Sequence, residues 1–320
     1  MTQLTSVLYA TAAAVAMAAT VPGEGRQTRT AQPPPTTSAD ARPAPTLQEL
    51  KNTSYKGVEA AGGAFTLADG RWEGKPYERG GNSRPSVTFV GDFRLTGDLD
   101  GNGAEEAAVL LAANAGGTGE MSYLAIVGRP AGRITNIATA PIGDRVQVRD
   151  ARIDGRRIVL DVVQAGEGDA ACCPGDFVTR SWELQAGGLK EGVPVKTGRL
   201  SIDALAGTEW VLRSWGRDEP APASPEVTAK FEGQRVAGSA GCNNYVAQLG
   251  AGAAPGDLKV GPVGATRMMC PEGQMSVEAR FLRQLGGVTR MRFIAGRLIL
   301  SYSKTDEMFD EMLFDRRPSP

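Results

Sequence analysis

The chain has 320 residues, of which 35 are Lys or Arg and 36 are Asp or Glu, so its formal net charge is −1. A balanced charge argues against a nucleic-acid-binding protein, because such proteins need a basic surface to displace the counterions of the phosphate backbone. The sequence contains no histidine, which excludes Ser-His-Asp and Cys-His catalysis as well as His-ligated zinc. The length predicts two domains.

The chain begins with an uncharged, alanine-rich run at residues 7–21. A helix of that length is about 22 Å long, short of the ~30 Å hydrocarbon core of a bilayer. The run contains the small-residue cleavage pattern Ala16-Met17-Ala18, although no Lys or Arg precedes Arg26. These features predict a signal peptide over residues 1–21. We therefore expect an exported protein, periplasmic or secreted, with no transmembrane span after cleavage.

A disordered linker is expected next, at residues 22–45, because this stretch is rich in Pro, Thr, Ala and Ser and has almost no large apolar side chains. Residues 46–199 then predict a β-rich first domain. Thr46 and Glu49 have the spacing of a capping box, so a short helix should begin there. Strand-like segments bounded by turns follow at residues 64–67, 86–90, 107–112, 122–127, 134–139, 146–153, 158–163 and 177–184. The Asp154-Gly155 pair within residues 153–156 predicts a hairpin turn between two of them.

An acidic, glycine-containing loop at residues 97–106 is the sharpest motif of this first domain. Oxygen-bearing side chains stand where positions 1, 3, 5 and 9 of an EF-hand loop supply ligands, at Asp98, Asp100, Asn102 and Glu106. Ala104 would add a backbone carbonyl, but Val109 stands where an EF-hand has its bidentate Glu. The segment resembles the DxDxDG calcium loops of secreted β proteins such as integrin-type repeats. Two interpretations of this loop remain open. It is either a structural Ca²⁺ site or an Asp/Asn/Gly turn that holds no ion.

Cys172 and Cys173 are adjacent in the chain. Neighbouring Cα atoms lie about 3.8 Å apart, below the usual disulfide range, so a bond between them would be strained and reducible. A vicinal disulfide, free thiols, and a metal site or pairing with the other cysteines remain alternatives. The DxxCCP pattern of residues 169–174, with other segments of residues 47–185, resembles an uncharacterised exported bacterial domain without an established activity.

The second predicted domain, residues 200–317, contains ordered motifs at residues 205–212, 236–245, 266–271, 278–285 and 298–300. These segments resemble the META domain, also called HslJ-like. The residues at its motif positions are Gly241, Cys242, Asn243, Tyr245, Thr266, Met268 and Cys270. The resemblance implies a small, curved, barrel-like antiparallel sheet with one packed helix. It also implies kinship with exported or lipoprotein bacterial proteins linked to stress or antibiotic tolerance, none of which offers a clear enzymatic template.

A helix is also predicted from the residues alone, because Val277, Phe281 and Leu285 repeat at helical spacing before the stop at Gly286-Gly287. The four cysteines allow three pairings. A bond between Cys242 and Cys270, both at META motif positions, is the simplest. The alternative is two buried free cysteines that act as small apolar residues.

The expected fold is mainly β (α+β), with two β-rich domains. No catalytic residue is predicted. The segment Ala237–Gly241 is a near miss for a nucleophile elbow, but that device needs a histidine. Acidic residues at 306–311 predict an amphipathic terminal segment, and the arginines of residues 289–293 predict a solvated strand face.

We expect a non-catalytic envelope protein that acts as a binding or stress-tolerance module. Structural Ca²⁺ is the only cofactor that we expect. The expected partner is an unidentified envelope protein or a small ligand, and nucleic acid is not expected. An accessory or chaperone-like component of an envelope machine, and an enzyme that uses carboxylates or Lys, are the alternatives.

Overall fold

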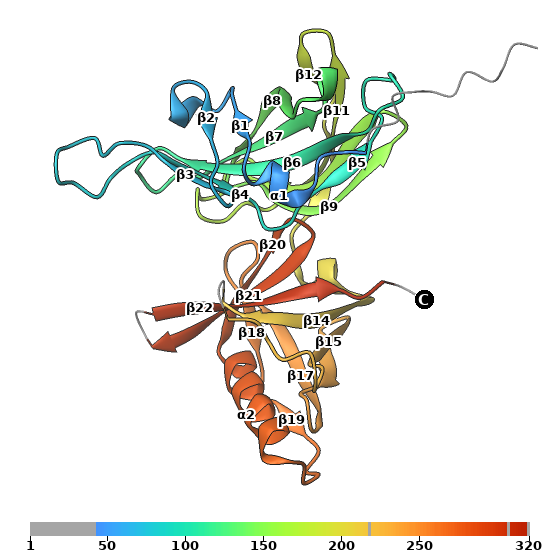
Figure 1. Ribbon diagram of the computed structural model, residues 1–320. Coiled ribbons are helices and arrows are strands. Elements are labelled where there is room, and N and C mark those ends of the chain that lie inside the picture. The colour runs from blue at the N-terminus through green and yellow to red at the C-terminus, as the bar shows by residue number, and fades with distance from the viewer. Residues whose placement is uncertain (1–42, 217–218, 306–307, 319–320) are drawn as a thin grey trace, which may run out of the picture. The chain divides into compact units, whose positions relative to one another are not determined.

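The structure is a computed structural model that describes residues 43–216, 219–305 and 308–318 (Figure 1). The predicted signal peptide and most of the predicted linker lie outside the described residues. All described residues fall in one compact unit, Asp40–Pro320, which contains the predicted domain boundary near residue 200. None of the described helices has both the length and the apolar character needed to cross a bilayer.

Two antiparallel sheets account for the strands between residues 71 and 199. The first has the order β3-β4-β6-β7-β8, with β5 also paired to β6. Its strands are β3 (Arg71–Glu73), β4 (Ser86–Phe89), β5 (Leu95–Gly97), β6 (Glu106–Asn114), β7 (Met121–Gly128) and β8 (Thr135–Asp144). The second has the order β12-β11-β10-β9, with β13 also paired to β11. Its strands are β9 (Gln147–Asp154), β10 (Arg157–Gln164), β11 (Asp176–Gln185), β12 (Gly188–Glu191) and β13 (Val195–Arg199).

Strand β6 is buried on both faces, which explains why its sequence is a continuous apolar run rather than an alternation. Leu110 packs with Leu160 and Trp182 of the second sheet. The neighbouring Leu111 points the other way, into a cluster with Tyr55. That cluster is covered by α1 (Leu47–Leu50), β1 (Ser54–Tyr55), the 3-10 helix η1 (Glu59–Ala61) and β2 (Phe65–Thr66).

The structure confirms the helix cap and the hairpin turn that were predicted within residues 46–199. Thr46 caps α1, and its side chain and that of Glu49 form the reciprocal hydrogen bonds of a capping box. The turn after Asp154 joins β9 to β10, with Gly155 in the left-handed region at φ +62°. A short 3-10 helix, η2 (Pro130–Gly132), separates β7 from β8.

A nine-stranded antiparallel sheet follows, in the order β18-β17-β16-β15-β14-β22-β21-β20, with β19 paired to β17. Its first strands are β14 (Thr208–Trp215), β15 (Thr228–Glu232), β16 (Arg235–Ser239), β17 (Asn244–Ala251), β18 (Leu258–Val260) and β19 (Gly264–Ala265). The remaining strands are β20 (Val288–Ile294), β21 (Arg297–Thr305) and β22 (Met308–Arg316). A bridge between Asp257 and Arg290 links the two ends of the strand order, so the sheet is a nearly closed barrel.

One long helix, α2 (Glu272–Gly286), packs against this barrel (Figure 1). Phe281 and Leu285 of its apolar face are buried, and Phe281 meets the ring of Tyr245 edge-on. The helix ends at the predicted glycine pair, with Gly287 as its C-cap. The 3-10 helix η3 (Ile202–Leu205) leads into β14 and adds Leu205 to the same core. The mainly β fold with a C-terminal barrel-like sheet and one packed helix is thus as expected.

The structure differs from the sequence expectation at the C-terminal segment. The last of the META-like segments, residues 298–300, lies in β21, yet a further strand, β22, follows it in the chain and lies between β14 and β21. Met312 and Phe314 of β22 are fully buried, because alternate residues of the segment face the barrel core. Of the described acidic residues, Glu311 alternates with the buried Met312 and pairs with Arg292, whereas Asp310 accepts a hydrogen bond from the buried Tyr302.

Candidate functional site

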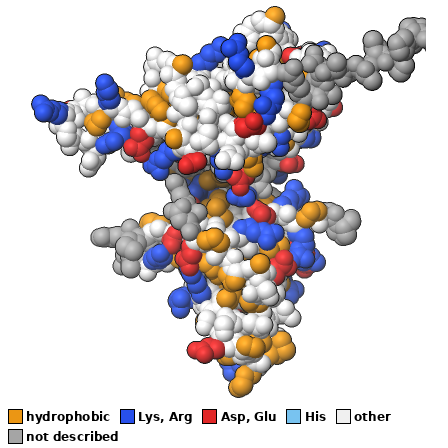
Figure 2. Space-filling view, viewed as in Figure 1, with side chains coloured by type: hydrophobic (Ala, Val, Ile, Leu, Met, Phe, Trp, Pro, Cys, Tyr) orange, Lys and Arg blue, Asp and Glu red, His pale blue; other side chains and the backbone are white. Residues whose placement is uncertain are grey.

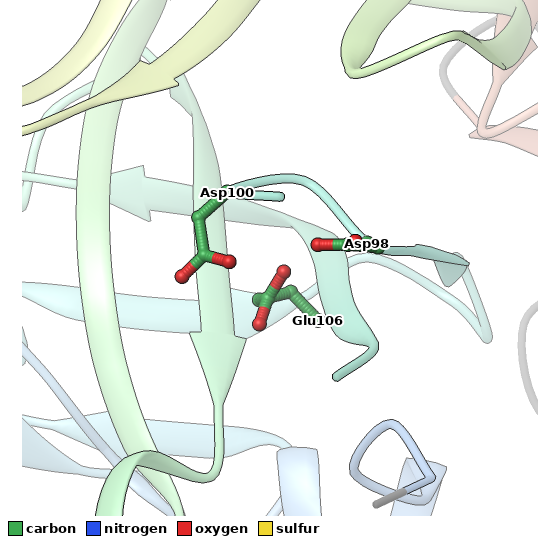
Figure 3. Close-up of side chains that lie close together, drawn as sticks. All are labelled: Asp98, Asp100 and Glu106. Carbon is green, nitrogen blue, oxygen red and sulfur yellow. The ribbon is translucent and has the colours of Figure 1, made fainter. Parts of the chain in front are cut away.

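The acidic loop between β5 and β6 brings three of the predicted ligand residues together. Ligand oxygens of Asp98, Asp100 and Glu106 all lie within 4.8 Å of one another (Figure 3). Gly101 and Gly103 adopt φ values of +82° and +87°, which allow the chain to turn back on the Asp98 carboxylate. That carboxylate accepts the backbone N–H groups of Gly101 and Gly103, at 2.7 and 3.1 Å.

Asn102 and Ala104, the other two predicted ligand residues, take part in the turn itself. The Asn102 amide donates to Asp100 Oδ2 at 2.9 Å, and its Oδ1 accepts the N–H of Ala104 at 2.7 Å. These contacts are those of the Asx-type turn that the sequence left open as the alternative. The structure therefore assembles three carboxylates at one point and uses the amide to shape the loop.

Glu106 is the unusual member of this cluster, because its side chain is buried at the start of β6. Its Oε2 accepts the backbone N–H of Leu99 at 2.9 Å. Burial raises the pKa of the Glu106 carboxyl above its ordinary value, and the negative charges of Asp100 and Asp98 add to that rise. An all-oxygen donor set of three carboxylates suits a hard cation such as Ca²⁺, whose charge would relieve this repulsion.

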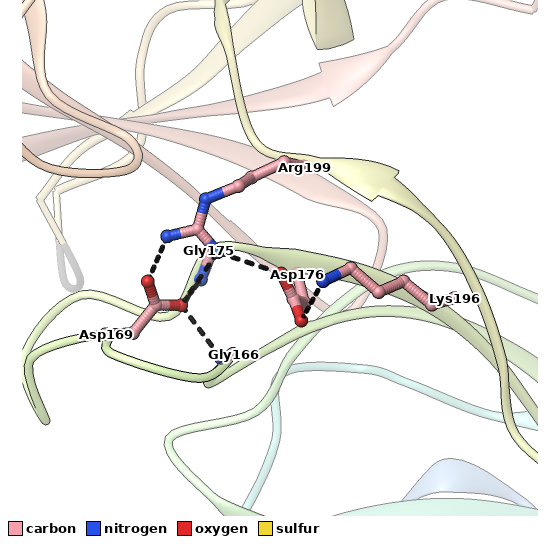
Figure 4. Close-up of polar contacts among 6 residues, drawn as sticks. All are labelled: Gly166, Asp169, Gly175, Asp176, Lys196 and Arg199. Atoms are coloured by element: carbon pink, nitrogen blue, oxygen red, sulfur yellow. Dashed lines mark hydrogen bonds and ion pairs between the residues drawn. The ribbon is translucent and has the colours of Figure 1, made fainter.

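A second organised loop, residues 165–175, carries the adjacent cysteines between β10 and β11. Asp169 closes it, because its Oδ2 accepts the N–H groups of Gly166 and Gly175 at 2.8 and 2.9 Å (Figure 4). Arg199 of β13 donates to both Asp169 and Asp176, and Lys196 pairs with Asp176 at 2.7 Å. The hydrogen bond from Arg199 lowers the pKa of the Asp169 carboxyl below its ordinary value.

Within this loop, Cys172 and Cys173 form a disulfide with each other. Cys173 is 3% exposed, whereas Cys172 is exposed to solvent. Arg290 of β20 donates from Nη1 to Cys173 Sγ at 3.0 Å and to the Cys172 carbonyl at 3.5 Å. The two sulfurs therefore have different surroundings, one open and one beside a cation.

The META motif residues of the barrel gather around a second disulfide, between Cys242 and Cys270, with a Cα separation of 6.0 Å. Buried Asn243 accepts hydrogen bonds at Oδ1 from Thr266 Oγ1 and from the Met268 N–H, each at 2.7 Å. Tyr245 donates to the Thr228 carbonyl at 2.9 Å. Gly241 has φ +109°, a conformation that favours glycine. These motif residues hold the barrel, the loop of residues 266–270 and α2 together.

The same loop exposes apolar side chains. The exposed fractions of Met268 and Met269 are 58% and 94%, and that of Met275 in α2 is 45%. The side chains of Met291 and Met312, in contrast, are buried in the barrel core. On the face shown in Figure 2, Lys and Arg side chains of the described residues are interspersed with Asp and Glu.

The acidic residues of β22 are paired with cations. Two of them, Asp310 and Glu311, line a cavity of about 360 Å³ with Gly216, Ser301 and Phe309. Asp310 pairs with Lys304, which lowers the pKa of the Asp310 carboxyl, and Glu311 pairs with Arg292 at 2.5 Å.

Sequence reasoning missed the roles of Arg199 and Arg290. The arginines of β20 were expected on a solvated face, but Arg290 is bound by Asp257 and Arg292 by Glu311. Their partners lie 33 and 19 positions away in the chain, so no local pattern could have indicated the pairing.

Comparisons with known proteins bear mainly on the barrel. No curated protein matches the chain. One solved structure, an NMR structure of a protein from Burkholderia xenovorans, is 26% identical, with a TM-score of 0.31, over 37% of this chain and 87% of that one. With so low a TM-score, that structure gives no information about the fold of this chain. The family model of the META domain matches residues 203–312, so this part of the chain is similar to that family.

Proposed function

We propose that this protein is a non-catalytic, exported module of the bacterial cell envelope that binds an envelope protein or a small ligand and supports stress or antibiotic tolerance. The observation that carries the proposal is the state of the cysteines. All four cysteines of the chain are in disulfides, Cys172–Cys173 and Cys242–Cys270. A structural disulfide such as Cys242–Cys270 persists in oxidising compartments and is rare in the cytosol, which supports an extracytoplasmic location.

The META match over residues 203–312 supports the same proposal, since the META domain is not a known catalytic family. The described acidic residues add to this, because those that line the cavity at β22 are each paired with a cation. Export would be tested by fractionating cells that express the full chain and sequencing the mature N-terminus. We expect extracytoplasmic protein that begins between about residues 17 and 24. Uncleaved protein with reduced cysteines in the cytosol would contradict the proposal.

We further propose that the β5–β6 loop holds a structural Ca²⁺ through Asp98, Asp100 and Glu106. The support is the convergence of their oxygens and the burial of Glu106. An ion there would join the loop to the first residue of β6 and neutralise a buried charge. Its expected role is to stabilise the first sheet rather than to take part in a reaction, because the ligands belong to one turn. Isothermal titration of the purified protein with CaCl₂, with MgCl₂ as the comparison, tests this.

One observation favours the accessory-component alternative. Met268, Met269 and Met275 present exposed, flexible thioether side chains near the Cys242–Cys270 disulfide. Methionine-rich surfaces adapt to varied apolar partners. A photo-crosslinker at position 269 should then capture an envelope protein in living cells, whereas one at exposed Glu105 should not.

A further inference from the structure

The two disulfides differ in how their sulfurs are surrounded. We propose that Cys172–Cys173 is a thiol–disulfide exchange centre, which accepts two electrons from a dithiol while Cys242–Cys270 stays oxidised. In this exchange Cys172 is the sulfur that is attacked, and Cys173 is the thiolate that leaves. The inference goes beyond the proposed envelope function and does not depend on the calcium site.

Access decides which sulfur is attacked. A thiolate must approach along the S–S axis, so it needs an exposed target sulfur. Cys172 is exposed, while Cys173 is 3% exposed. Attack on Cys172 expels the Cys173 sulfur as a thiolate.

Arg290 stabilises that leaving group. Its Nη1 already lies 3.0 Å from Cys173 Sγ. A buried thiolate without a counter-charge would be costly, whereas a neighbouring guanidinium lowers the pKa of a thiol. Asp257 Oδ1 binds Arg290 at Nε and Nη2, at 3.1 and 2.7 Å, and so fixes the direction of the guanidinium. Since a thiol of lower pKa leaves faster, the site favours expulsion of Cys173 over expulsion of Cys172.

The loop is held independently of the S–S bond. Asp169 binds both of its ends, at Gly166 and Gly175, and the Cys173 N–H donates to the Ala170 carbonyl at 2.9 Å. The two thiols therefore stay adjacent after reduction and can be re-oxidised in place. The charged groups around the loop are Asp169, Asp176, Lys196, Arg199, Asp257 and Arg290.

The chemistry balances with one dithiol. Its first thiolate bonds to Cys172 Sγ as the Cys172–Cys173 bond breaks and Cys173 leaves as a thiolate. The second thiol of the reductant, once deprotonated, then attacks its own partner sulfur and releases Cys172 as a thiolate. The dithiol becomes a disulfide, and the protein gains two electrons and two thiols after protonation.

The second disulfide is an internal control. Cys242 has a neutral amide, Asn243 Nδ2, 3.3 Å from its sulfur, in place of a guanidinium. Its partner lies 28 positions away, so its reduction opens a loop of the barrel.

The test is a time course of reduction of the full-length oxidised protein by dithiothreitol, quenched with acid, alkylated and mapped by mass spectrometry. We expect Cys172–Cys173 to be reduced at least tenfold faster than Cys242–Cys270. Arg290→Gln should slow that reduction about tenfold, Arg290→Lys should retain most of the rate, and Arg292→Gln on the same strand should have no effect. Glutathione, a monothiol, should be trapped as a mixed disulfide on Cys172.

Three results would overturn the proposal. They are equal reduction rates for the two disulfides, the same rate in Arg290→Gln and Arg292→Gln, and glutathione trapped on Cys173. Circular dichroism and the melting temperature of each variant show whether the fold is intact. If Arg290→Gln does not fold, the pH dependence of Cys173 alkylation in the reduced wild-type protein decides. A Cys173 pKa at or above that of Cys172 would contradict the role of Arg290.

Discussion

Glu278 of α2 binds Asn243 of the barrel through both carboxylate oxygens. Its Oε2 lies 2.6 Å from the Asn243 backbone nitrogen, and its Oε1 lies 3.2 Å from the side-chain Nδ2. Because Asn243 also binds Thr266 and Met268, one buried amide connects the helix, the start of β17 and the loop of the Cys242–Cys270 disulfide. Asn243 of the META motif thus satisfies the hydrogen-bonding groups of its buried polar neighbours.

Replacing this amide should destabilise the barrel. Asn243→Ala removes the side-chain partner of Glu278 Oε1, of the Thr266 hydroxyl hydrogen and of the Met268 N–H, which should lower the free energy of unfolding by about 3 kcal/mol. Urea denaturation followed by tryptophan fluorescence measures the change. The control is Asn244→Ala at the exposed neighbouring position, which should change stability by no more than about 0.5 kcal/mol. Equal losses in the two variants would show that the hydrogen-bond network is not what stabilises this corner.

Local sequence signals predicted much of this fold because their causes are local. The capping box at Thr46, the turn at Gly155 and the apolar face of α2 each depend on residues within a few positions of one another. The central position of β22 was missed because strand order depends on pairing across the barrel, here between Leu212 and Phe314.

The candidate sites, too, could be predicted only where their residues are close together in the sequence. Asp98, Asp100 and Glu106 belong to one turn, so their spacing indicated that they would converge. Arg290 reaches Cys173 from a strand 117 positions away, and no spacing rule predicts such a contact. Burial of Glu106 was equally hidden, because it follows from the pairing of β6 between β5 and β7.

Calcium should stabilise the protein more at neutral pH than at acid pH. The pKa of Glu106 is raised in the folded state, so its contribution to stability is fully present below its ordinary pKa and is lost as the pH rises through the raised value. Ca²⁺ would offset that loss by neutralising the carboxylate. We expect the increase in melting temperature on adding 5 mM CaCl₂ (about that concentration suffices for weak extracellular sites) to be larger at neutral pH than near the ordinary pKa of Glu.

Glu106→Gln isolates the charge in the same experiment. The amide can still accept the Leu99 N–H, so the calcium-free variant should melt at or above the wild-type temperature at neutral pH, and its response to calcium should be much smaller. Glu105→Gln changes the exposed neighbour and should keep the full response. A calcium response that survives in Glu106→Gln would exclude Glu106 as a ligand.

The Asp169 carboxylate should make the fold sensitive to acid. Hydrogen bonds from Arg199 and the loop N–H groups lower its pKa, so its stabilising effect is present above the ordinary pKa of Asp and is lost as the pH falls through the lowered value. Asp169→Asn should flatten the fall in stability at pH values below the ordinary pKa of Asp. Acid titration followed by circular dichroism measures this. Asp203→Asn, at an exposed position, should titrate as the wild type does.

The two disulfides should differ in their contribution to stability as well. Cys242 and Cys270 are 28 positions apart, so their bond restricts the unfolded chain and should contribute about 3–4 kcal/mol by loop entropy. Cys172 and Cys173 are adjacent, so their bond closes no chain loop of that kind. The double variant Cys242→Ala with Cys270→Ala should therefore unfold at a much lower urea concentration than the double variant Cys172→Ala with Cys173→Ala.

If Cys242 and Cys270 were buried free thiols instead, reductant would leave the wild-type unfolding midpoint unchanged, and both thiols would be alkylated in denaturant without reduction. Non-reducing peptide mapping of the same samples separates the two cases, because only a bonded pair yields the linked peptide.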